Sequence, residues 1–245
     1  MWAFLHKFGS PRHFYRISGR LLPWLGWLTA LLMVAGLYGG LVVAPPDYQQ
    51  GESYRIIFIH VPSAWMSLFV YVLMAAAGAV GLVWHIKLAD VVAAASAPIG
   101  ASFTFLALVT GSLWGKPMWG TYWVWDARLT SELVLLFLYF GVIGLHAAIE
   151  DKRTASRAAA VLALVGVVNI PIIHYSVEWW STLHQGPTVT KVAAPSIHLS
   201  MLMPLLIMAL AFKLYFFTVL LMRARSEVLE RERASAWVRE LARGT

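Results

Sequence analysis

One short stretch of the chain concentrates aromatic side chains: it carries Trp114, Trp119, Tyr122, Trp123 and Trp125. Tryptophan and tyrosine favour the headgroup level of a membrane, so an interfacial belt is the first interpretation. A belt needs few such residues at each helix end, whereas four of the chain's 12 tryptophans lie here. Glycines and Pro117 shape the backbone between them, and indole faces stack on flat conjugated rings. Residues 114–128, the tryptophan segment, therefore predict a loop that offers a surface to a large, flat, apolar ligand.

Two of the eight histidines, His60 and His184, are predicted to flank the tryptophan segment. Imidazole is a common axial ligand of haem iron, and two imidazoles from different elements could hold one porphyrin edge-on. The alternative is that each histidine caps a helix end or donates to a backbone carbonyl. Their place beside an aromatic cluster favours metal ligation and leaves the alternative open.

Charged residues near the tryptophan segment have competing interpretations. Arg55, Lys116 and Arg128 could pair with the propionate carboxylates of a haem, although loop charges near a membrane are usually solvated or paired with lipid headgroups. Asp126 precedes an apolar stretch, so its side chain is placed to accept from the first amides of a helix. We favour this capping role for Asp126 over a direct ligand contact.

The composition is that of a membrane protein. The 245 residues are 60% hydrophobic and 13% charged, with a mean hydropathy of +0.69. A soluble domain has a lower apolar fraction, so the excess must face lipid. The absence of cysteine excludes disulfides, thiolate metal sites, iron–sulfur clusters and haem attached covalently to this chain through cysteines. No phosphate-binding glycine loop or nucleophile motif occurs in its required context, so any ATP hydrolysis must come from a partner.

Six apolar stretches are long enough to cross a bilayer as helices: 21–43, 56–84, 91–113, 129–149, 158–177 and 199–222. The first is too long for a removed signal peptide and lacks a small-residue cleavage site in the usual place. Asn169 and Pro171 should interrupt the fifth stretch, while Pro98 and Pro204 should kink the third and sixth. Lys213, inside the sixth, is expected to snorkel toward the cytoplasmic end. The sequence predicts an all-α integral membrane protein, a six-transmembrane-helix bundle.

The charge distribution predicts the orientation of this bundle. Six spans leave both termini on one side, and that side carries 14 of the 19 lysines and arginines, against four on the other and Lys213 within a span. Because this excess marks the cytoplasmic face, both termini should be cytoplasmic. The expected parts are a basic tail (1–20), a membrane domain (21–222) with the tryptophan segment and the loop 178–198 outside, and a charged tail (223–245). The net charge of +7 thus reflects orientation, and we expect no nucleic-acid partner.

Several motifs together carry a family resemblance. The run Trp119-Gly-Thr-Tyr-Trp-Val-Trp-Asp126 resembles the tryptophan-rich (WWD) signature of haem-handling membrane proteins, and the likeness extends over 111–118 and 127–132. Residues 169–180 and 181–186 are similar to one branch of that group. This branch is the haem exporter protein C (CcmC) family of bacterial system I cytochrome c maturation. The resemblance covers almost the whole chain and is weakest in the two tails.

The resemblance implies a multi-pass protein of the bacterial inner membrane with the tryptophan segment in the periplasm. The family's flanking histidines fall on His60 and His184, as axial ligands of haem iron. Its aromatic and acidic site residues fall on Trp114, Trp119, Trp123, Trp125 and Asp126. Arg55 and Arg128 join this haem site by charge and proximity alone.

In such a protein, haem b is bound non-covalently and passed to a periplasmic haem chaperone, which attaches it through its own histidine. ABC-type ATPase and membrane subunits and a small single-span subunit are the implied partners, and ATP hydrolysis by the partners would release the loaded chaperone. We therefore expect haem handling and transfer and no catalysis by this chain. Two alternatives remain: a haem lyase that attaches haem directly to apocytochrome c, and a structural docking subunit of an ABC-type complex.

Overall fold

The computed structural model describes residues 10–186, 189, 191 and 194–243. Its helices are α2 (Pro11–Tyr38), α3 (Ile57–Trp84), α4 (Lys87–Trp119), α5 (Ala127–Ala148), α6 (Lys152–Gly166), α7 (Asn169–Trp179), α8 (Leu199–Arg231) and α9 (Ala236–Arg243). A π-helical turn (Gly39–Val43) extends α2, and a 3-10 turn (Glu52–Ile56) leads into α3. Over the described residues the chain forms helices and no strand, which confirms the predicted all-α class.

Six helical segments of the described chain are long and apolar enough to cross a membrane. They are Pro11–Val43, Glu52–Trp84, Lys87–Trp119, Ala127–Ala148, Lys152–Trp179 and Leu199–Arg231. Only 17% of the most apolar window of the first segment is buried, and Trp24 and Trp27 on it are each 78% exposed. Such apolar surface is stable only against lipid or another membrane protein, so the predicted six-span bundle is confirmed.

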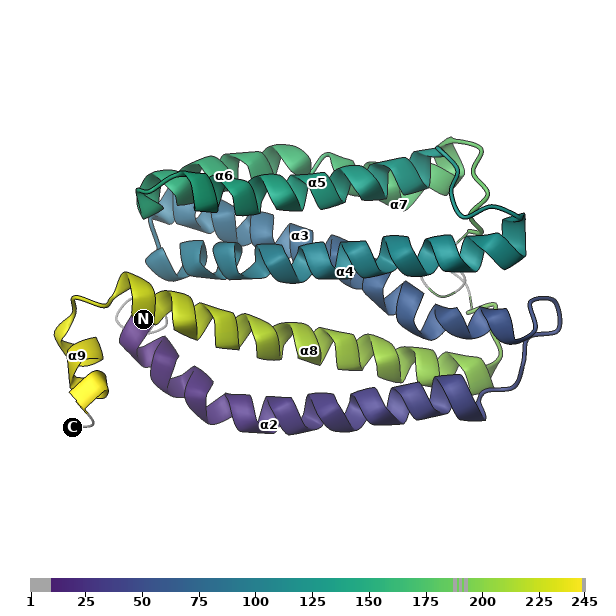
Figure 1. The fold of residues 1–245 in the computed structure, drawn as a ribbon, viewed down its shortest axis with the longest axis horizontal. Coiled ribbons are helices and arrows are strands. Elements are labelled where there is room, and N and C mark those ends of the chain that lie inside the picture. The colour runs from purple at the N-terminus through teal and green to yellow at the C-terminus, as the bar shows by residue number, and fades with distance from the viewer. Residues whose placement is uncertain (1–9, 187–188, 190, 192–193, 244–245) are drawn as a thin grey trace.

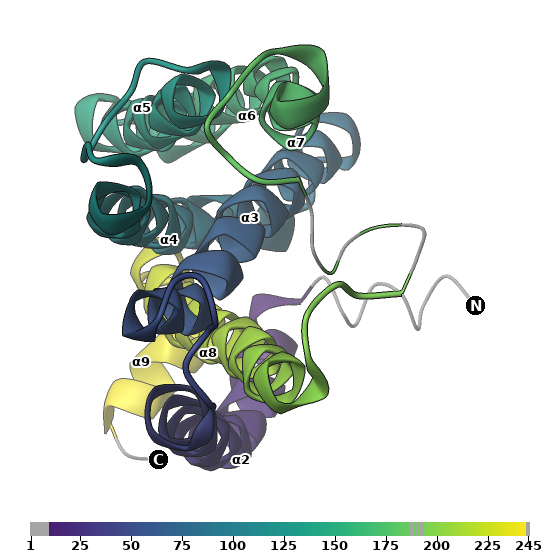
Figure 2. The same ribbon diagram turned by 90° about the vertical axis from the view of Figure 1, so that its right-hand side faces the viewer.

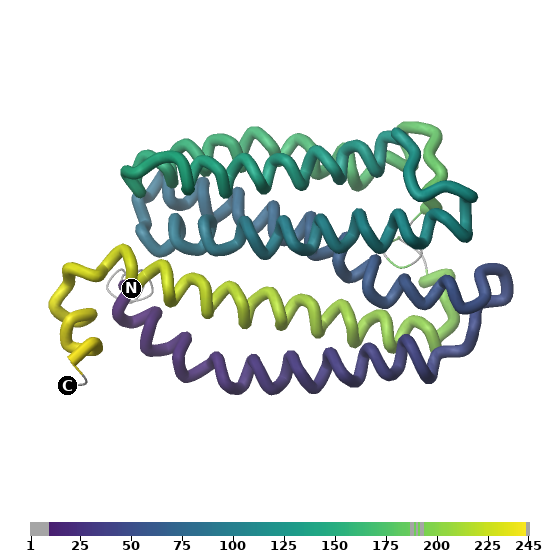
Figure 3. Tube along the Cα trace, in the orientation of Figure 1, coloured from purple at the N-terminus to yellow at the C-terminus, as the bar shows by residue number. Residues whose placement is uncertain are grey.

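The helices run side by side, so their loops gather at two ends (Figure 1). Pro11 and Arg243 lie at one end, with the turns 85–86 and 149–151. The loops 44–51 and 120–126 and the described segments 180–186 and 194–198 lie at the other end, which we call the loop end (Figures 1 and 3). Seen along the helices, α3 and α4 are central, α5, α6 and α7 lie on one side of them, and α2 and α8 lie on the other (Figure 2).

The tryptophan segment is more helical than predicted. Helix α4 continues through Trp119, so Trp114 and Trp119 are helical and only 120–126 is a loop. The helix tolerates Pro117 in its last turn and ends at Gly120, which has a φ of 77° and donates its N–H to the Lys116 carbonyl at 3.0 Å. A left-handed glycine at this position is a common helix terminator. The loop start predicted at residue 114 was therefore wrong by about a turn and a half of helix.

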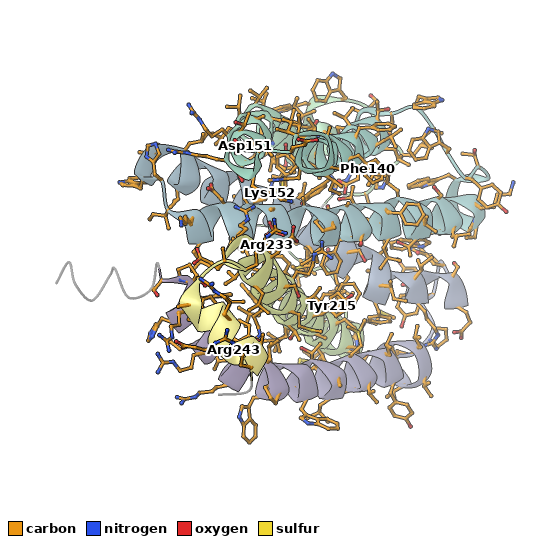
Figure 4. The ribbon with its side chains drawn as sticks, turned by 60° about the vertical axis from the view of Figure 1, so that its left-hand side comes forward. Phe140, Asp151, Lys152, Tyr215, Arg233 and Arg243 are labelled. Carbon is orange, nitrogen blue, oxygen red and sulfur yellow. The ribbon has the colours of Figure 1, made fainter. Side chains whose placement is uncertain are left out.

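The other helix ends also differ from the sequence prediction. Helix α2 begins at Pro11, where proline suits a first helical position, and α8 runs on to Arg231, so the first span begins earlier and the sixth ends later than predicted. The predicted interruption of the fifth span is confirmed, because α6 ends at Gly166 and α7 begins at Asn169. Figure 4 labels Asp151, whose side chain caps α6 by accepting from the Thr154 N–H at 2.8 Å.

Candidate functional site

The loop end of the bundle brings together the residues that the sequence singled out. His60 lies in the first turn of α3, Trp114 and Trp119 lie in the last turns of α4, and Asp126 starts α5. His184 lies in the loop that follows α7. His184 and Arg128 lie near enough to act electrostatically on His60, so the ends of three helices and one loop converge on a single site.

His60 is held by the neighbouring helix α4. Its Nδ1 lies 3.0 Å from the Ala107 carbonyl oxygen and 3.1 Å from the Thr110 hydroxyl. A carbonyl oxygen can only accept, so Nδ1 carries the proton and donates, which leaves the lone pair of Nε2 free. The ring also lies against Gly111, where an added Cβ would approach the His60 Cε1 to 2.9 Å. The ring is thus fixed in position and in tautomer, as a metal-ligating histidine requires.

His184 comes to the site from its loop and contacts two predicted site residues. Its ring lies 4.9 Å from the Trp119 ring, centroid to centroid, at a tilt of 59°. Its Nδ1 lies 3.8 Å from the Asp126 Oδ2, too far for a hydrogen bond. The predicted capping role of Asp126 is confirmed, because its other oxygen, Oδ1, accepts from the Leu129 N–H at 2.8 Å. Asp126 thus caps α5 with one oxygen and faces His184 with the other.

Three buried polar atoms at this site have no hydrogen-bond partner within the described chain: Trp123 Nε1, Asp126 Oδ2 and His184 Nδ1. Leaving a buried polar atom without a partner costs about 1–3 kcal/mol. Three such atoms around one aromatic cluster indicate a site that is completed by a ligand or by a small movement of the His184 loop.

Burial and charge set the protonation state of His184. Burial lowers its pKa, the positive charge of Arg128 lowers the pKa further, and Asp126 raises it in part. His184 is therefore a neutral imidazole at pH 7, with a nitrogen lone pair available to a metal.

The four tryptophans do not form one flat surface. Trp114 lies edge-on to His60 at 5.7 Å and donates its Nε1–H to the Gln50 side-chain oxygen at 3.0 Å. Trp123 and Trp125 are edge-to-face at 5.4 Å, and Trp125 is 76% exposed. One pair of tryptophans thus supports the two histidines, while Trp125 presents apolar surface outward.

The predicted cations differ in position. The Arg55 guanidinium contacts the Glu52 carboxylate and donates to the Gly40 carbonyl at 2.9 Å, so its described contacts are within the 40–55 region. Arg128 lies closer to the histidines: its charge acts on His184, and its Nη1 is 3.5 Å from the Ile173 carbonyl oxygen. The Lys116 Nζ donates to the Gly120 carbonyl at 3.0 Å. The structure favours Arg128 over Arg55 as the cation of this site.

Three residues that shape this end of the bundle were not predicted in the roles that the structure gives them. Gln50 holds Trp114, and Gly111 makes room for the His60 ring. Glu132 lies one turn below Arg128, is only 9% exposed, and accepts from the Ser67 hydroxyl at 2.7 Å. A carboxylate within an apolar span was the available signal for Glu132. Gly111 was predicted as a glycine that shapes the backbone, without its contact with His60, and no sequence signal distinguished Gln50 from other loop amides.

Comparisons with known proteins give the family of this chain. The sequence profile of haem exporter protein C matches residues 4–239. Haem exporter protein C of Escherichia coli K12 is 55% identical over 98% of this chain and 97% of its own length, and that of Haemophilus influenzae is 50% identical over 99% and 98%. A mitochondrial protein of Marchantia polymorpha, named for cytochrome c biosynthesis and for its likeness to CcmC, is 44% identical over 81% and 82%. As its motifs predicted, the chain belongs to the haem exporter protein C (CcmC) family.

Proposed function

We propose that this protein binds haem at the loop end of the bundle and delivers it during c-type cytochrome biogenesis. His60 and His184 supply the iron ligands, Trp114 and Trp119 pack around the porphyrin edge, and Arg128 pairs with a propionate. Haem is the cargo here, held non-covalently as haem b. The family name and the name of the Marchantia relative support haem handling and cytochrome c biosynthesis.

One observation carries the proposal: two imidazoles from distant parts of the chain converge, each with Nδ1 directed at an oxygen. The His60 Nδ1 donates to the Ala107 carbonyl, and the His184 Nδ1 faces Asp126. An acceptor behind Nδ1 fixes the ring and makes Nε2 the better ligand. A histidine that only packed or capped a helix would not need this arrangement. Its occurrence twice at one site favours iron ligation.

The residues present fit haem as a cargo. Two neutral nitrogen donors, indole rings and a buried arginine match its iron, its apolar macrocycle and its carboxylates respectively. The Trp119 and His184 rings are already in contact, at 4.9 Å. A small shift of the His184 loop would bring its Nδ1 within hydrogen-bond distance of Asp126.

The orientation and the partners of the protein are part of the same proposal. The excess of lysine and arginine on the side of the termini supports a periplasmic location for the loop end. There the exposed Trp125 and Tyr122, which are 76% and 56% accessible, are available to a periplasmic haem chaperone. Aromatic side chains of this kind are typical anchors of protein interfaces. ABC-type ATPase and membrane subunits and a small single-span subunit would complete the assembly and supply ATP hydrolysis.

Substitution of the two histidines tests the proposal. We would purify the protein in detergent, add haemin, and record the visible spectrum of the parent, His60→Gly, His184→Gly and a control, His174→Ala. His174 is an exposed histidine at the same end of the bundle. Both glycine variants should lose most bound haem, and added imidazole should restore part of the parent spectrum by filling the vacated ligand position. The control should match the parent.

Two results would refute the ligand assignment. One is haemin binding by both glycine variants with the parent's spectrum and affinity. The other is an equal loss in His174→Ala, which would trace the effect to general damage at this end. If haem binds as proposed, transfer to a purified haem chaperone, and not direct formation of holocytochrome, separates delivery from a haem-lyase activity.

A further inference from the structure

Lys213 lies deep within an apolar helix. It is 14 residues from Leu199, where α8 begins, and ten residues before Arg223, the next charged residue. At 1.5 Å per residue these separations are about 21 Å and about 15 Å along the helix axis. A bilayer core is about 30 Å thick, so Lys213 is placed in its middle part and its charge is not at either interface.

The side chain does not reach a membrane surface. A lysine side chain extends roughly 6 Å from its Cα, far less than the distance to Arg223. Side chains on a helix also tilt toward its N-terminus, which for α8 is the end away from Arg223. The Nζ lies 5.0 Å from the ring centroid of Phe69, itself in the middle of α3. The expected snorkelling toward the cytoplasmic end is therefore not what the structure shows.

Lys213 has no carboxylate within salt-bridge distance anywhere in the described chain. The described ion pairs of lysine and arginine lie near helix ends or in loops. Helix α8 contributes to two of them, both through residues beyond 226. The face of Phe69 gives Lys213 a cation–π contact. Ionisable residues within a membrane are expensive and usually pair with another polar or charged group. The exposed Lys213 lacks such a group.

Lys213 lies on an exposed, apolar face of α8 that could pack against another helix. Met203, Leu206, Leu210 and Lys213 follow one another at spacings of three, four and three residues, which places them on one face of α8. The three apolar members are 50%, 42% and 50% exposed. Val72 on α3, one turn from Phe69, is 47% exposed. We call this set the lysine stripe: Met203, Leu206, Leu210 and Lys213 of α8 with Phe69 and Val72 of α3.

We infer that the lysine stripe docks a transmembrane helix of a different membrane protein, and that a carboxylate on that helix pairs with Lys213. A second copy of this chain does not fit. Its deepest carboxylate in the described spans, Glu132, is buried and engaged with Ser67, and the others lie in loops or within the end turns of helices. A lipid phosphate does not fit either, because headgroups do not reach the middle of the bilayer. The inference is independent of the haem site.

Photocrosslinking tests which molecule covers the stripe. We would place p-benzoylphenylalanine at Leu210 in the full chain in native membranes, with Phe140 as the matched control. Phe140 is a large apolar residue on α5, 49% exposed, and is labelled in Figure 4 away from α8. The expected product at Leu210 is a crosslink to an apolar segment that carries an aspartate or glutamate within one helical turn of the crosslinked residue. The Phe140 position should not give this product.

Charge substitution then tests the pairing. Loss of one member of a buried charge pair leaves the other unpaired, so Lys213→Met should reduce the recovered partner by at least about tenfold. Lys213→Arg should retain it, and Lys213→Glu should recover it when the partner's carboxylate is replaced by lysine. The isolated protein should have an unchanged or higher melting temperature in Lys213→Met, because the variant removes an unpaired charge from an apolar face.

Three outcomes would overturn the inference. One is crosslinking at Leu210 to lipid alone, and another is recovery of the partner within twofold of the parent in Lys213→Met. The third is a lower melting temperature of isolated Lys213→Met, which would make Lys213 a structural residue through its contact with Phe69.

Discussion

The substitution Gly111→Ala tests whether the position of His60 affects haem binding separately from the stability of the fold. An alanine Cβ at residue 111 would lie 2.9 Å from the His60 Cε1 and 3.4 Å from its Nδ1. Carbon atoms in contact are normally about 3.5–4.0 Å apart, so the ring must move by about half an ångström or more. The hydrogen bond from Nδ1 to the Ala107 carbonyl, 3.0 Å long, would be stretched or lost.

The expected effect on folding is small because two contributions oppose each other. A lost hydrogen bond costs about 0.5–1.5 kcal/mol. Replacing a helix-interior glycine by alanine contributes about 0.5–1 kcal/mol of stability. The free energy of unfolding should therefore change by less than about 1 kcal/mol. Haem binding has no such compensation, since disturbing the group behind a metal-ligating histidine reduces affinity about 10–100-fold.

Haemin titration of the purified variant, beside its melting temperature, measures both effects. Gly144→Ala on α5 is the matched control, because an added Cβ there meets nothing within 4 Å. The control should keep the parent's haem affinity. Gly111→Ala could instead bind haemin with the parent's affinity and melt at the parent's temperature. That result would show that His60 does not need its observed position and would refute the reasoning.

Further predictions concern the second histidine and the aromatic residues. Trp125→Ala should lower haem transfer to a chaperone with little change in melting temperature, because Trp125 is 76% exposed, while Trp119→Ala should lower haem occupancy itself through its contact with His184. Asp126→Asn should keep the helix cap yet lose up to about tenfold in haem affinity, whereas Asp126→Ala should also lose about 1 kcal/mol of stability. Because burial, with Arg128, lowers the pKa of His184 in the folded state, the unfolded chain takes up a proton below about pH 6.5 that the folded chain does not. Stability should then fall as pH falls below that value, and His184→Leu should flatten the decline in a pH series of melting temperatures.

The membrane fold was predictable because hydrophobicity acts over whole segments. Each predicted span coincides with an observed helix over most of its length. The boundaries were less predictable, since tertiary contacts decide where a helix stops. Pro117 and Gly115 suggested a loop, yet α4 continues to Trp119 and ends only at Gly120, where the backbone turns left-handed. The sequence identified Gly115 and Gly120 as possible ends of this helix but could not predict which of them ends it.

The candidate site, like the fold, was predictable only in part. Residue type and topology predicted His60, His184 and the tryptophans at one end, and in the structure the two histidines are near enough to interact electrostatically, each against a tryptophan. The groups behind the histidines were not predictable, because a backbone carbonyl such as that of Ala107 has no sequence signature. Arg55 and Arg128 looked equivalent as outer cations, and only the fold separates them.

Of the two proposed iron ligands, His60 is held more rigidly than His184. This difference suits the proposed release of haem as cargo. His60 lies on a helix, with its Nδ1 bonded to a carbonyl at 3.0 Å. His184 lies on a loop, with its Nδ1 still 3.8 Å from the nearest carboxylate oxygen of Asp126. Moving a loop disturbs fewer packed contacts than moving a helix turn. If haem is delivered as proposed, His184 would therefore leave the iron first, while His60 holds the haem until the transfer is complete.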